Sequence, residues 1–449
     1  MMENLLGMSN VNDKDFVSGK EPFFMQTEAD KAFAALIAPM LRMKLWQSGK
    51  GSVVTFFAND KVSEYIKDAE SFTKLSTLFA SAPLFVAKKE TAEEQYSLLE
   101  KELEAYQNEN GNKPSIIAIE ALGVFAHGAS KKACDAAKSL FLKGVLVLCG
   151  AEKALFEKAA ANYAEIVKAE EEKACGRMYE RIMVVTGSAQ GFGQGIAEEI
   201  IKEGANVIIA DLNEALAIEN AKKLSDSVGA EKAVPVKVDV SDEASVENMY
   251  IETVLEFGGV DALVNNAGIV RAGNLEEMTV PMFDLVTKVN YTAYFLCTKY
   301  AVKYMKIQNR FCPEYFMDII QINSKSGLAG SNKNFAYAGS KFGGIGLTQS
   351  FALELTPFNI KVNSICPGNF LDGPLWMDPE KGLFVQYLKA GKVPGAKTVD
   401  DVRRAYESKV PMNRGCRVMD VVRAIYYCVE QEYETGQAIP VTGGQEMLK

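Results

Sequence analysis

Short runs of apolar and β-branched residues recur in the second part of the chain, and helix-length segments separate them. From Arg181 onward these runs are IMVVTG, ANVIIAD, AVPVKVDV, ALVNNAG, DIIQINS and IKVNSICPG. Apolar strands of this kind are typical of a parallel sheet whose two faces are both covered by helices. The pattern therefore predicts an α/β fold with a Rossmann-type, doubly wound parallel sheet over residues 182–449.

Residues 1–150 carry a separate alternation of helices and strands. We expect a helix around Glu28–Leu45, strands at SVVTFF, APLFVA and PSIIAIEALGVFA, and a helix from Ser130 to Leu148. Residues 151–181 are rich in Ala, Glu and Lys, which predicts a solvent-facing linker helix. The expected organisation is a smaller α/β domain over residues 1–150, a helical linker over residues 151–181 and the larger domain over residues 182–449.

Composition and charge narrow the possible functions. The chain has 449 residues, of which 24% are charged, and its formal net charge is -9. An acidic chain disfavours nucleic acid and anionic membranes as partners, because both require clustered Lys and Arg. No apolar run approaches the roughly 18 residues of a membrane span, and no basic segment precedes an apolar core near Met1, so we expect a cytoplasmic protein. Eight cysteines without CxxC spacing indicate reduced thiols.

His127, in GVFAHGAS, is the only histidine of the chain. A single histidine excludes histidine-rich metal sites and leaves little room for a Ser-His-Asp triad. A structural role for His127 is favoured over a catalytic one. We therefore expect no metal site and a catalytic base of another residue type.

A glycine-rich turn joins the first strand of the larger domain to the next helix. In TGSAQGFG the strand IMVV runs into the turn, and the helix GIAEEIIKEG follows it. This context lets backbone amides and a helix N-terminus meet a pyrophosphate, with glycine where a Cβ would block close approach. A tight turn without a ligand is the alternative. The expected cofactor contacts here are Gly187, Ser188, Gln190, Gly191, Phe192 and Gly193.

Asp211 ends the second strand of this domain, where its carboxylate can accept hydrogen bonds from both hydroxyls of an adenosine ribose. The same charge would repel a 2′-phosphate, and Ser188 and Ala189 offer no cation to attract one, so NAD is favoured over NADP. For the other strand ends, turn formation is the alternative to cofactor binding. The contacts expected there are Asp239 and Val240 near the adenine, and Asn266, Ala267 and Gly268 beside the cofactor.

Tyr337 and Lys341 form a YxxxK motif, so they share one face of a helix. The Lys341 ammonium can lower the pKa of Tyr337 and hold the ribose, which makes the phenolate a usable base near neutral pH. YxxxK alone is common and usually carries no function. The motif is significant here because Ser324, at the end of strand DIIQIN, could hydrogen-bond the reacting oxygen. Asn290, in TKVNYTAYF, could hold a water near Lys341 and complete a proton relay.

Taken together and in order, TGxxxGxG, NNAG, Asn290, Ser324, YxxxK and Pro367-Gly368 resemble the short-chain dehydrogenase/reductase family from about Ile182 to Leu448. The resemblance implies that Tyr337 is the acid/base and that Ser324 orients the substrate. It implies that Lys341 tunes the tyrosine and contacts the ribose, and that Asn290 serves the water relay. Many members have a threonine after Pro-Gly that binds the nicotinamide carboxamide, whereas this chain has Asn369, which puts that contact in doubt. Further cofactor contacts are expected from Pro367, Gly368 and Phe370.

Four segments, IIQINSKSG, FGGIGLTQSFALEL, ESKVPMNRGC and TGQAIPVTGGQ, resemble sorbitol-6-phosphate 2-dehydrogenases, which interconvert sorbitol 6-phosphate and fructose 6-phosphate. A phosphorylated substrate needs cations, although each candidate could equally form a salt bridge. The region from Leu375 to Val402 is expected to close over the site. The candidate cations are Arg271, Lys325, Lys333 and Arg414, and the expected substrate contacts are Arg271, Lys325 and Asn369.

Two other functions remain open. One is a short-chain dehydrogenase that acts on another polyol, sugar or small aldehyde. The other is a non-catalytic nucleotide-binding scaffold, against which the complete set of catalytic residues argues. In every case we expect a small-molecule ligand and a homo-oligomer, either a dimer or a tetramer.

Two segments of the first part, FTKLSTLFASAPLFVA and PSIIAIEALGVFAHGASKKACDAA, resemble the class II aldolase/adducin-like module. That module precedes the dehydrogenase in fused rhamnulose-phosphate aldolase/alcohol dehydrogenase proteins. Class II aldolases of this kind bind zinc through several histidines, whereas this region has only His127. We therefore expect a reduced, metal-free domain that serves packing or assembly, with a regulatory ligand site as the alternative.

Overall fold

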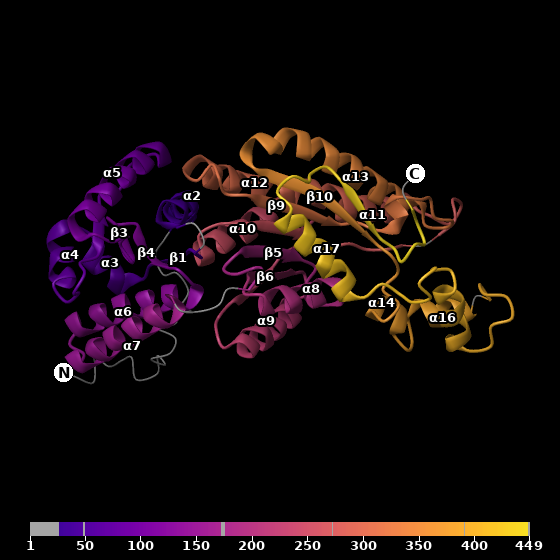
Figure 1. Cartoon of the computed structure of the whole chain (residues 1–449), viewed down its shortest axis with the longest axis horizontal. Coiled ribbons are helices and arrows are strands. Elements are labelled where there is room, and N and C mark those ends of the chain that lie inside the picture. Colours follow the sequence, from indigo (N-terminus) through magenta and orange to yellow (C-terminus); the bar gives the residue numbers. More distant parts are fainter. Residues whose placement is uncertain (1–26, 48–49, 172–175, 272, 390, 448–449) are drawn as a thin grey trace. The chain divides into compact units, whose positions relative to one another are not determined.

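The chain folds into two compact units. The first unit comprises Met1–Ala174 together with Ile251–Gly259 and Arg310–Cys312, and the second comprises the remaining residues. The computed structural model describes residues 27–47, 50–171, 176–271, 273–389 and 391–447 (Figure 1). Each unit has a sheet of its own.

The sheet of the first unit has four strands in the order β1-β4-β3-β2. β4 pairs antiparallel with β1 and with β3, and β2 pairs parallel with β3. Helices and strands alternate along this unit, as the sequence predicts. The strands are β1 Val53–Phe57, β2 Leu84–Val86, β3 Ile116–Ile119 and β4 Gly123–Gly128. The helices are α2 Glu28–Leu45, α3 Asp60–Ile66, α4 Ala69–Ser76, α5 Ala92–Asn110, α6 Lys131–Leu148 and α7 Lys153–Glu171.

Local signals explain most of these boundaries. The predicted helices over Glu28–Leu45 and from Ser130 are confirmed, and Ser130 caps α6 by accepting a hydrogen bond from the Ala133 amide. The single strand predicted over PSIIAIEALGVFA is wrong, because the chain turns back between β3 and β4 into a hairpin. Ala121 adopts a left-handed φ of 52° at that turn, and alanine gives no sequence signal for such a conformation.

The helix predicted over residues 151–181 is present as α7. It packs along α6, and the side chain of Phe156 is buried against the ring of Phe79, with the centroids 5.2 Å apart. α7 belongs to the first unit. Most of the expected linker is therefore a packed helix of that unit.

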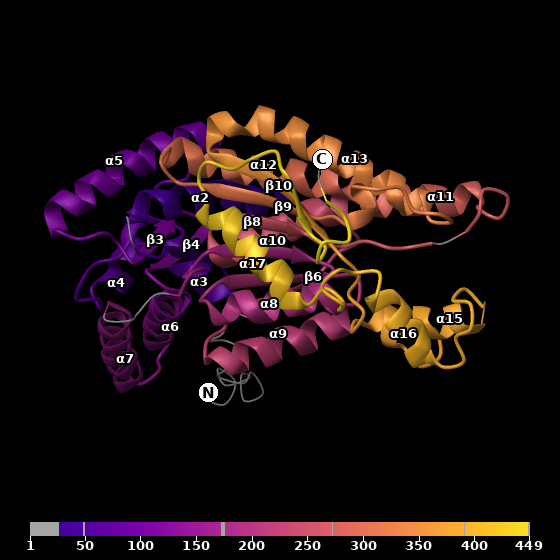
Figure 2. The same cartoon turned by 45° about the vertical axis from the view of Figure 1, so that its right-hand side comes forward.

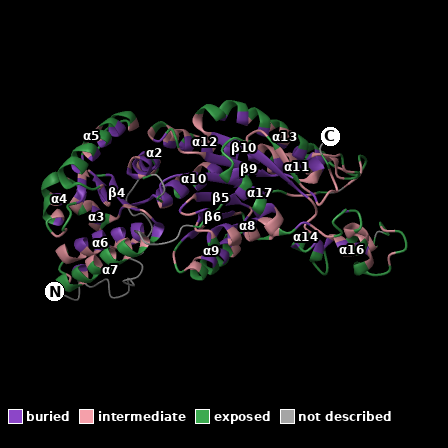
Figure 3. Ribbon diagram, in the orientation of Figure 1, coloured by how far each residue is buried: buried purple, intermediate pink, exposed green. Residues whose placement is uncertain are grey.

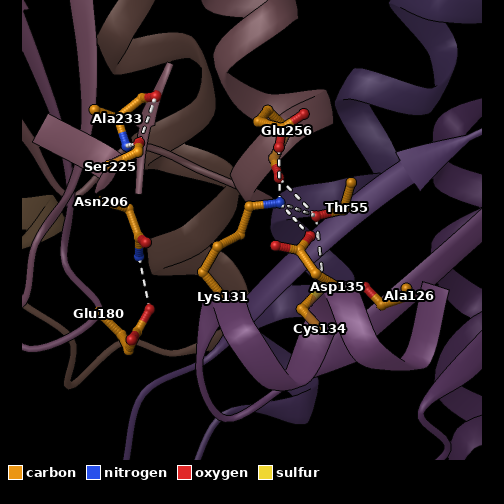
Figure 4. Close-up of polar contacts among 10 residues, drawn as sticks. All are labelled: Thr55, Ala126, Lys131, Cys134, Asp135, Glu180, Asn206, Ser225, Ala233 and Glu256. Carbon is orange, nitrogen blue, oxygen red and sulfur yellow. Dashed lines mark hydrogen bonds and ion pairs between the residues drawn. The ribbon is translucent and has the colours of Figure 1, made fainter. Parts of the chain in front are cut away.

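Figure 4 shows how the two units bury charged and polar groups. In the first unit the Lys131 ammonium is 2.5 Å from a carboxylate oxygen of Asp135 and 2.7 Å from one of Glu256. Lys131 is only 2% exposed, so these carboxylates compensate a charge that has almost no access to water. In the second unit the buried carboxylate of Glu180 accepts a 2.8 Å hydrogen bond from Asn206 (Figure 4). Glu180 also pairs with Lys232, which that view does not draw.

His127 lies in β4, half-buried, with its ring Nε2 3.3 Å from the hydroxyl of Ser52. Burial, together with the nearby charges of Lys113 and Arg42, lowers the pKa of His127 to about 3. The ring is therefore neutral at physiological pH and participates in a local hydrogen bond. This environment agrees with a structural role. Among the described residues no group of three or more His, Cys, Asp or Glu side chains could hold a metal ion.

The sheet of the second unit has seven parallel strands in the order β11-β10-β9-β8-β5-β6-β7. The predicted doubly wound parallel sheet is confirmed, and β11 is an additional strand within TGQAIPVTGGQ. The strands are β5 Ile182–Thr186, β6 Asn206–Asp211, β7 Ala233–Lys237, β8 Ala262–Asn265, β9 Met317–Ile322, β10 Ile360–Pro367 and β11 Ala438–Val441.

Helices cover both faces of this sheet (Figure 2). α8 (Gly191–Lys202) contacts α9 (Glu214–Val228) and α17 (Val418–Glu430) on one face, and their apolar side chains share a core with the strands. α10 (Glu243–Phe257), α12 (Ala293–Phe311) and α13 (Phe335–Leu355) lie on the other face. α11 (Val280–Thr287) leads into a π-helical turn, η1, over Lys288–Thr292. None of the helices in the described part of the chain is long and apolar enough to cross a membrane.

The order of the strands in this sheet determines where a ligand site can form. β5 lies between β8 and β6, so successive connections leave it on opposite sides and open a crevice at the carboxyl ends of these strands. β5 itself is buried along its whole length, as Figure 3 shows for the centre of this sheet. A ligand therefore meets the sheet at its carboxyl edge and not on a face.

Candidate active site

The glycine-rich turn follows β5, and packing explains two of its glycines. A Cβ at Gly187 would lie 2.9 Å from the Cα of Ala267, and one at Gly193 would lie 2.2 Å from the carbonyl oxygen of Gly187. Gly191 differs, since a Cβ there would meet no atom within 4 Å, although its φ is +65°. The space beside the first turn of α8 is therefore open, while the turn itself is held tightly.

The N-terminus of α8 is available to a ligand. Its N-cap, Gln190, is exposed and makes no hydrogen bond from its side chain to the first turn. Uncapped amides at a helix N-terminus suit an anion such as a pyrophosphate. The hydroxyl of Ser188 is not available in the same way, because it is buried and donates to the carbonyl of Val185 at 2.7 Å.

Thr186 and Asn266 fasten this turn to the end of β8. The hydroxyl oxygen of Thr186 accepts hydrogen bonds from the amides of Asn266 and Ala267, both at 3.0 Å. The Asn266 side chain donates to the carbonyls of Thr186 at 2.9 Å and Gly187 at 3.0 Å. Sequence reasoning missed Thr186, whose role depends on a contact with residues 80 positions away.

Asp211 lies half-buried at the end of β6, beside the turn. Its two carboxylate oxygens accept hydrogen bonds from the amides of Ala189 and Asn213, each at 2.9 Å. The carboxylate is thereby held at the edge of the crevice. Asp239 is exposed and accepts from the amide and hydroxyl of Ser241, which fits the alternative of turn formation, and the neighbouring Val240 is buried.

Ser324, Tyr337 and Lys341 meet at the carboxyl end of β9. Ser324 starts the short 3-10 turn η2 (Lys325–Gly327), and its side chain lies near enough to the Tyr337 hydroxyl to lower the pKa of that group. The Lys341 ammonium lies 5.6 Å from the centroid of the Tyr337 ring and donates to the carbonyl of Ile322 at 2.9 Å. Both Tyr337 and Lys341 come from the first turns of α13.

Burial controls the protonation of this pair. It raises the pKa of Tyr337 above its usual range, and the nearby hydroxyl of Ser324 opposes that effect. The direction is opposite to the lowered pKa expected from the sequence. Lys341 is 4% exposed, and burial lowers its pKa to about 8. At neutral pH the chain without ligands therefore holds a protonated phenol next to a lysine that is still mostly charged.

Asn290 lies within the π-helical turn η1, a type of distortion that is frequent at functional sites. Its carboxamide oxygen accepts from the amide of Ile269 at 2.8 Å, and its nitrogen donates to the carbonyl of the same residue at 2.9 Å. The nitrogen also lies 3.3 Å from the hydroxyl of Ser340. Asn290 thus fastens the segment that follows Gly268, a function that the sequence did not indicate.

The loop after β10 forms the other side of the site. Pro367 is buried, and the Gly368 amide donates to the carbonyl of Val441 in β11 at 2.9 Å. The backbone carbonyl of Asn369 accepts from the amide of Cys416 at 2.8 Å. The ring of Phe370 stacks on that of Phe192, with the centroids 4.4 Å apart and the planes 17° apart. The stack joins the first turn of α8 to the loop after β10, and both were predicted to contact the cofactor.

A cavity of about 510 Å³ lies next to this loop. Gly368 and Asn369 line it on one side, and Thr442, Gly443 and Glu446 line it on the other. Neither Ser324 nor Tyr337 is among its lining residues. The cavity therefore adjoins the cofactor loop and is not itself the catalytic pocket.

The candidate cations have different surroundings. The guanidinium of Arg414 forms two hydrogen bonds with the carboxylate of Asp420, at 2.6 and 3.0 Å. Arg414 is therefore already engaged in a salt bridge, which was the alternative to its role as a substrate cation. Arg271 is exposed and donates to the carbonyl of Val270. Lys325 is half-buried directly after Ser324, and Lys333 is exposed at a φ of 58°.

Comparison with known proteins assigns the family. A family model described as short chain dehydrogenase matches residues 181–379. The chain is 37% identical over 274 residues to the sorbitol-6-phosphate 2-dehydrogenase of Escherichia coli (strain K12), which covers 60% of this chain and 99% of that protein. The chain belongs to the short-chain dehydrogenase family.

Solved structures of short-chain dehydrogenases agree with this assignment. The sorbitol-6-phosphate 2-dehydrogenase SrlD from Erwinia amylovora is 38% identical, with a TM-score of 0.53 over 60% of this chain and 100% of that one. A 3-ketoacyl-(acyl-carrier-protein) reductase from Brucella melitensis, solved with NADH, is 26% identical, with a TM-score of 0.51 over the same shares. The predicted oxidoreductase family is confirmed, and the bound NADH of the reductase supports the predicted cofactor, NAD.

Proposed function

We propose that this short-chain dehydrogenase uses NAD to interconvert a polyol phosphate and a ketose phosphate, with sorbitol 6-phosphate and fructose 6-phosphate as the preferred pair. The observation that carries the proposal is the meeting of Ser324, Tyr337 and Lys341 in a chain 37% identical to a sorbitol-6-phosphate 2-dehydrogenase. A titratable tyrosine beside a buried lysine is typical of a site that moves protons. A non-catalytic scaffold has no need of such a pair.

The residues around the crevice fit NAD. The uncapped N-terminus of α8 suits the pyrophosphate, and the carboxylate of Asp211 suits two ribose hydroxyls. The same carboxylate would repel the 2′-phosphate of NADP. Predicted contacts at Phe192, Gly268, Pro367, Gly368 and Phe370 belong to this proposal. When bound, NAD accepts the hydride from the carbon that is oxidised.

The chain's own residues would handle the oxygen and its proton. In the direction of oxidation Tyr337 takes the proton of the C2 hydroxyl, while Ser324 donates a hydrogen bond to the same oxygen. Burial raises the pKa of Tyr337, and a charged Lys341 beside the ring would favour the phenolate during the reaction. We propose that Asn290 holds the water molecule through which this proton would exchange with solvent.

A substrate panel tests this function. Absorbance of reduced nicotinamide should rise when the full chain and NAD are mixed with sorbitol 6-phosphate. Tyr337→Phe should bind NAD normally, but its turnover rate should fall by a factor of about 10² to 10⁴, because a positioned proton-transfer group contributes that much. Turnover near that of the unmodified chain in Tyr337→Phe would contradict the mechanism.

The same panel separates the rival functions. Faster turnover of a neutral polyol or of a small aldehyde would reassign the substrate and keep the mechanism. Binding of NAD without turnover of any substrate would favour a scaffold. The homo-oligomeric state, the cytoplasmic location and the packing role of a reduced aldolase-like domain over residues 1–150 remain predictions of this proposal.

A further inference from the structure

The segment from Leu371 to Lys409, which we call the cap segment, is a folded part of the second unit. Its helices are α14 (Pro374–Met377), α15 (Leu383–Lys389) and α16 (Val399–Glu407), and Figure 2 shows α15 and α16 side by side. Leu371, Trp376, Phe384 and Val402 form a buried core there. The Arg403 guanidinium also pairs with Asp372 and Glu407. The cap segment therefore has a defined shape with which to present charges.

Two lysines of the cap segment rest on one pair of tyrosines. The rings of Tyr387 and Tyr406 are stacked, with the centroids 5.5 Å apart. The Lys392 ammonium lies 3.9 Å from the centroid of Tyr387, and the Lys409 ammonium lies 4.3 Å from that of Tyr406. The tyrosine pair thus holds both ammonium groups in the same part of the cap segment by cation–π contacts.

Two further lysines approach from the catalytic side of the crevice. Lys325 directly follows Ser324, and Lys333 lies in the loop before α13, where its carbonyl accepts a 3.0 Å hydrogen bond from the Gly273 amide. Val410, next to Lys409, lines the same cavity as Glu446, and the charges of Glu446 and Lys409 both act on Lys325. The end of the cap segment and the start of η2 are therefore neighbours in space.

Neighbouring lysines lower the pKa of two members of this group, Lys392 and Lys325. Burial lowers the pKa of Lys392, and the charges of Lys409 and Lys333 lower it further. Burial also lowers the pKa of Lys325, where Glu446 raises it and Lys409 again lowers it. In the described part of the chain none of the four ammonium groups has a carboxylate within 4.0 Å.

Four like charges gathered around a single carboxylate, Glu446, are costly, and an anion with several acceptor oxygens relieves that cost. We propose that Lys325, Lys333, Lys392 and Lys409 form a phosphate site between the cap segment and η2, and that this site takes the phosphate of the polyol phosphate. The inference rests on the proposed function and names its specificity residues. An anion held at Lys325 lies one residue from Ser324, so the phosphate fixes the far end of the substrate while Ser324 and Tyr337 meet the reacting hydroxyl. Arg414 takes no part, because Asp420 already occupies it.

Charge-neutralising substitutions in the cap segment test the site. Lys392→Gln and Lys409→Gln leave the catalytic residues untouched, and Lys389→Gln, on an exposed lysine of α15, is the matched control. At constant ionic strength we expect each site variant to lose about ten- to a hundredfold in kcat/KM for sorbitol 6-phosphate. All three should stay within about twofold for free sorbitol. Losses equal to that of Lys389→Gln would overturn the inference, even if sorbitol 6-phosphate proves to be the substrate.

Calorimetric titration with inorganic phosphate gives a readout without turnover. The unmodified chain and Lys389→Gln should bind phosphate, and the double variant of Lys392 and Lys409 should bind it at least about tenfold more weakly. If phosphate binds through these lysines but polyol phosphates are not oxidised, the site stands and the proposed function fails. If the unmodified chain and the double variant bind phosphate equally, the site is wrong whatever the substrate.

Discussion

Replacing Thr186 by valine should loosen the cofactor turn without changing its shape. Valine keeps the volume and the branched Cβ of threonine but removes the hydroxyl oxygen that accepts hydrogen bonds from the amides of Asn266 and Ala267, both at 3.0 Å. A donor left without an acceptor costs about 1 to 3 kcal/mol, and the lower end applies because both amides are only partly buried. The two together give about 2 kcal/mol.

Thermal unfolding and NAD titration measure this effect. A loss of about 2 kcal/mol corresponds to a fall of about 4 to 8 °C in Tm for a domain of 150–250 residues. NAD should bind more weakly to Thr186→Val, because the turn and the end of β8 are no longer fastened together. Thr186→Ser is the control, since it keeps the hydroxyl and loses one methyl group. If the valine variant matches the serine variant in both Tm and affinity, Thr186 does not fasten the turn.

Two further predictions concern the cofactor and pH. Asp211→Ser should remove the charge that repels a 2′-phosphate and shift the ratio of kcat/KM values from NAD towards NADP by about tenfold or more; an unchanged ratio in steady-state kinetics would contradict the role of Asp211. Burial raises the pKa of Tyr337, so the deprotonated fraction of this base grows as the pH rises above neutral. Oxidation should therefore accelerate from pH 7 towards alkaline pH while reduction slows, and parallel pH profiles in the two directions would show that another group titrates.

Local sequence patterns were sufficient to predict much of the fold. Apolar strands bounded by glycine or a capping residue predict their own limits, so β5, the turn after it and the start of α6 at Ser130 could be found from sequence. The hairpin between β3 and β4 could not, because Ala121 occupies a conformation for which alanine has no preference. The predictable features are those that depend on neighbouring residues alone.

The candidate site residues could be predicted from local motifs, whereas most of their contacts could not. YxxxK, Ser324 and the glycine turn are local motifs, and the structure brings each to the carboxyl edge of the sheet. The carboxamide of Asn290 bonds to the backbone of Ile269, and Phe192 stacks on Phe370. Each of these contacts joins positions that are distant in sequence, so it becomes visible only when the chain is folded.

The pairing of β10 with β11 has a consequence for the synthesis of this protein. The Gly368 amide in the cofactor loop needs the carbonyl of Val441, which the ribosome adds 73 residues later. At about 5 to 20 residues per second, that interval lasts on the order of 4 to 15 s. A nascent chain therefore acquires this part of the crevice only after Val441 has been added. NAD in the surrounding solution can stabilise a chain that already contains β11 but gives little assistance to a shorter one.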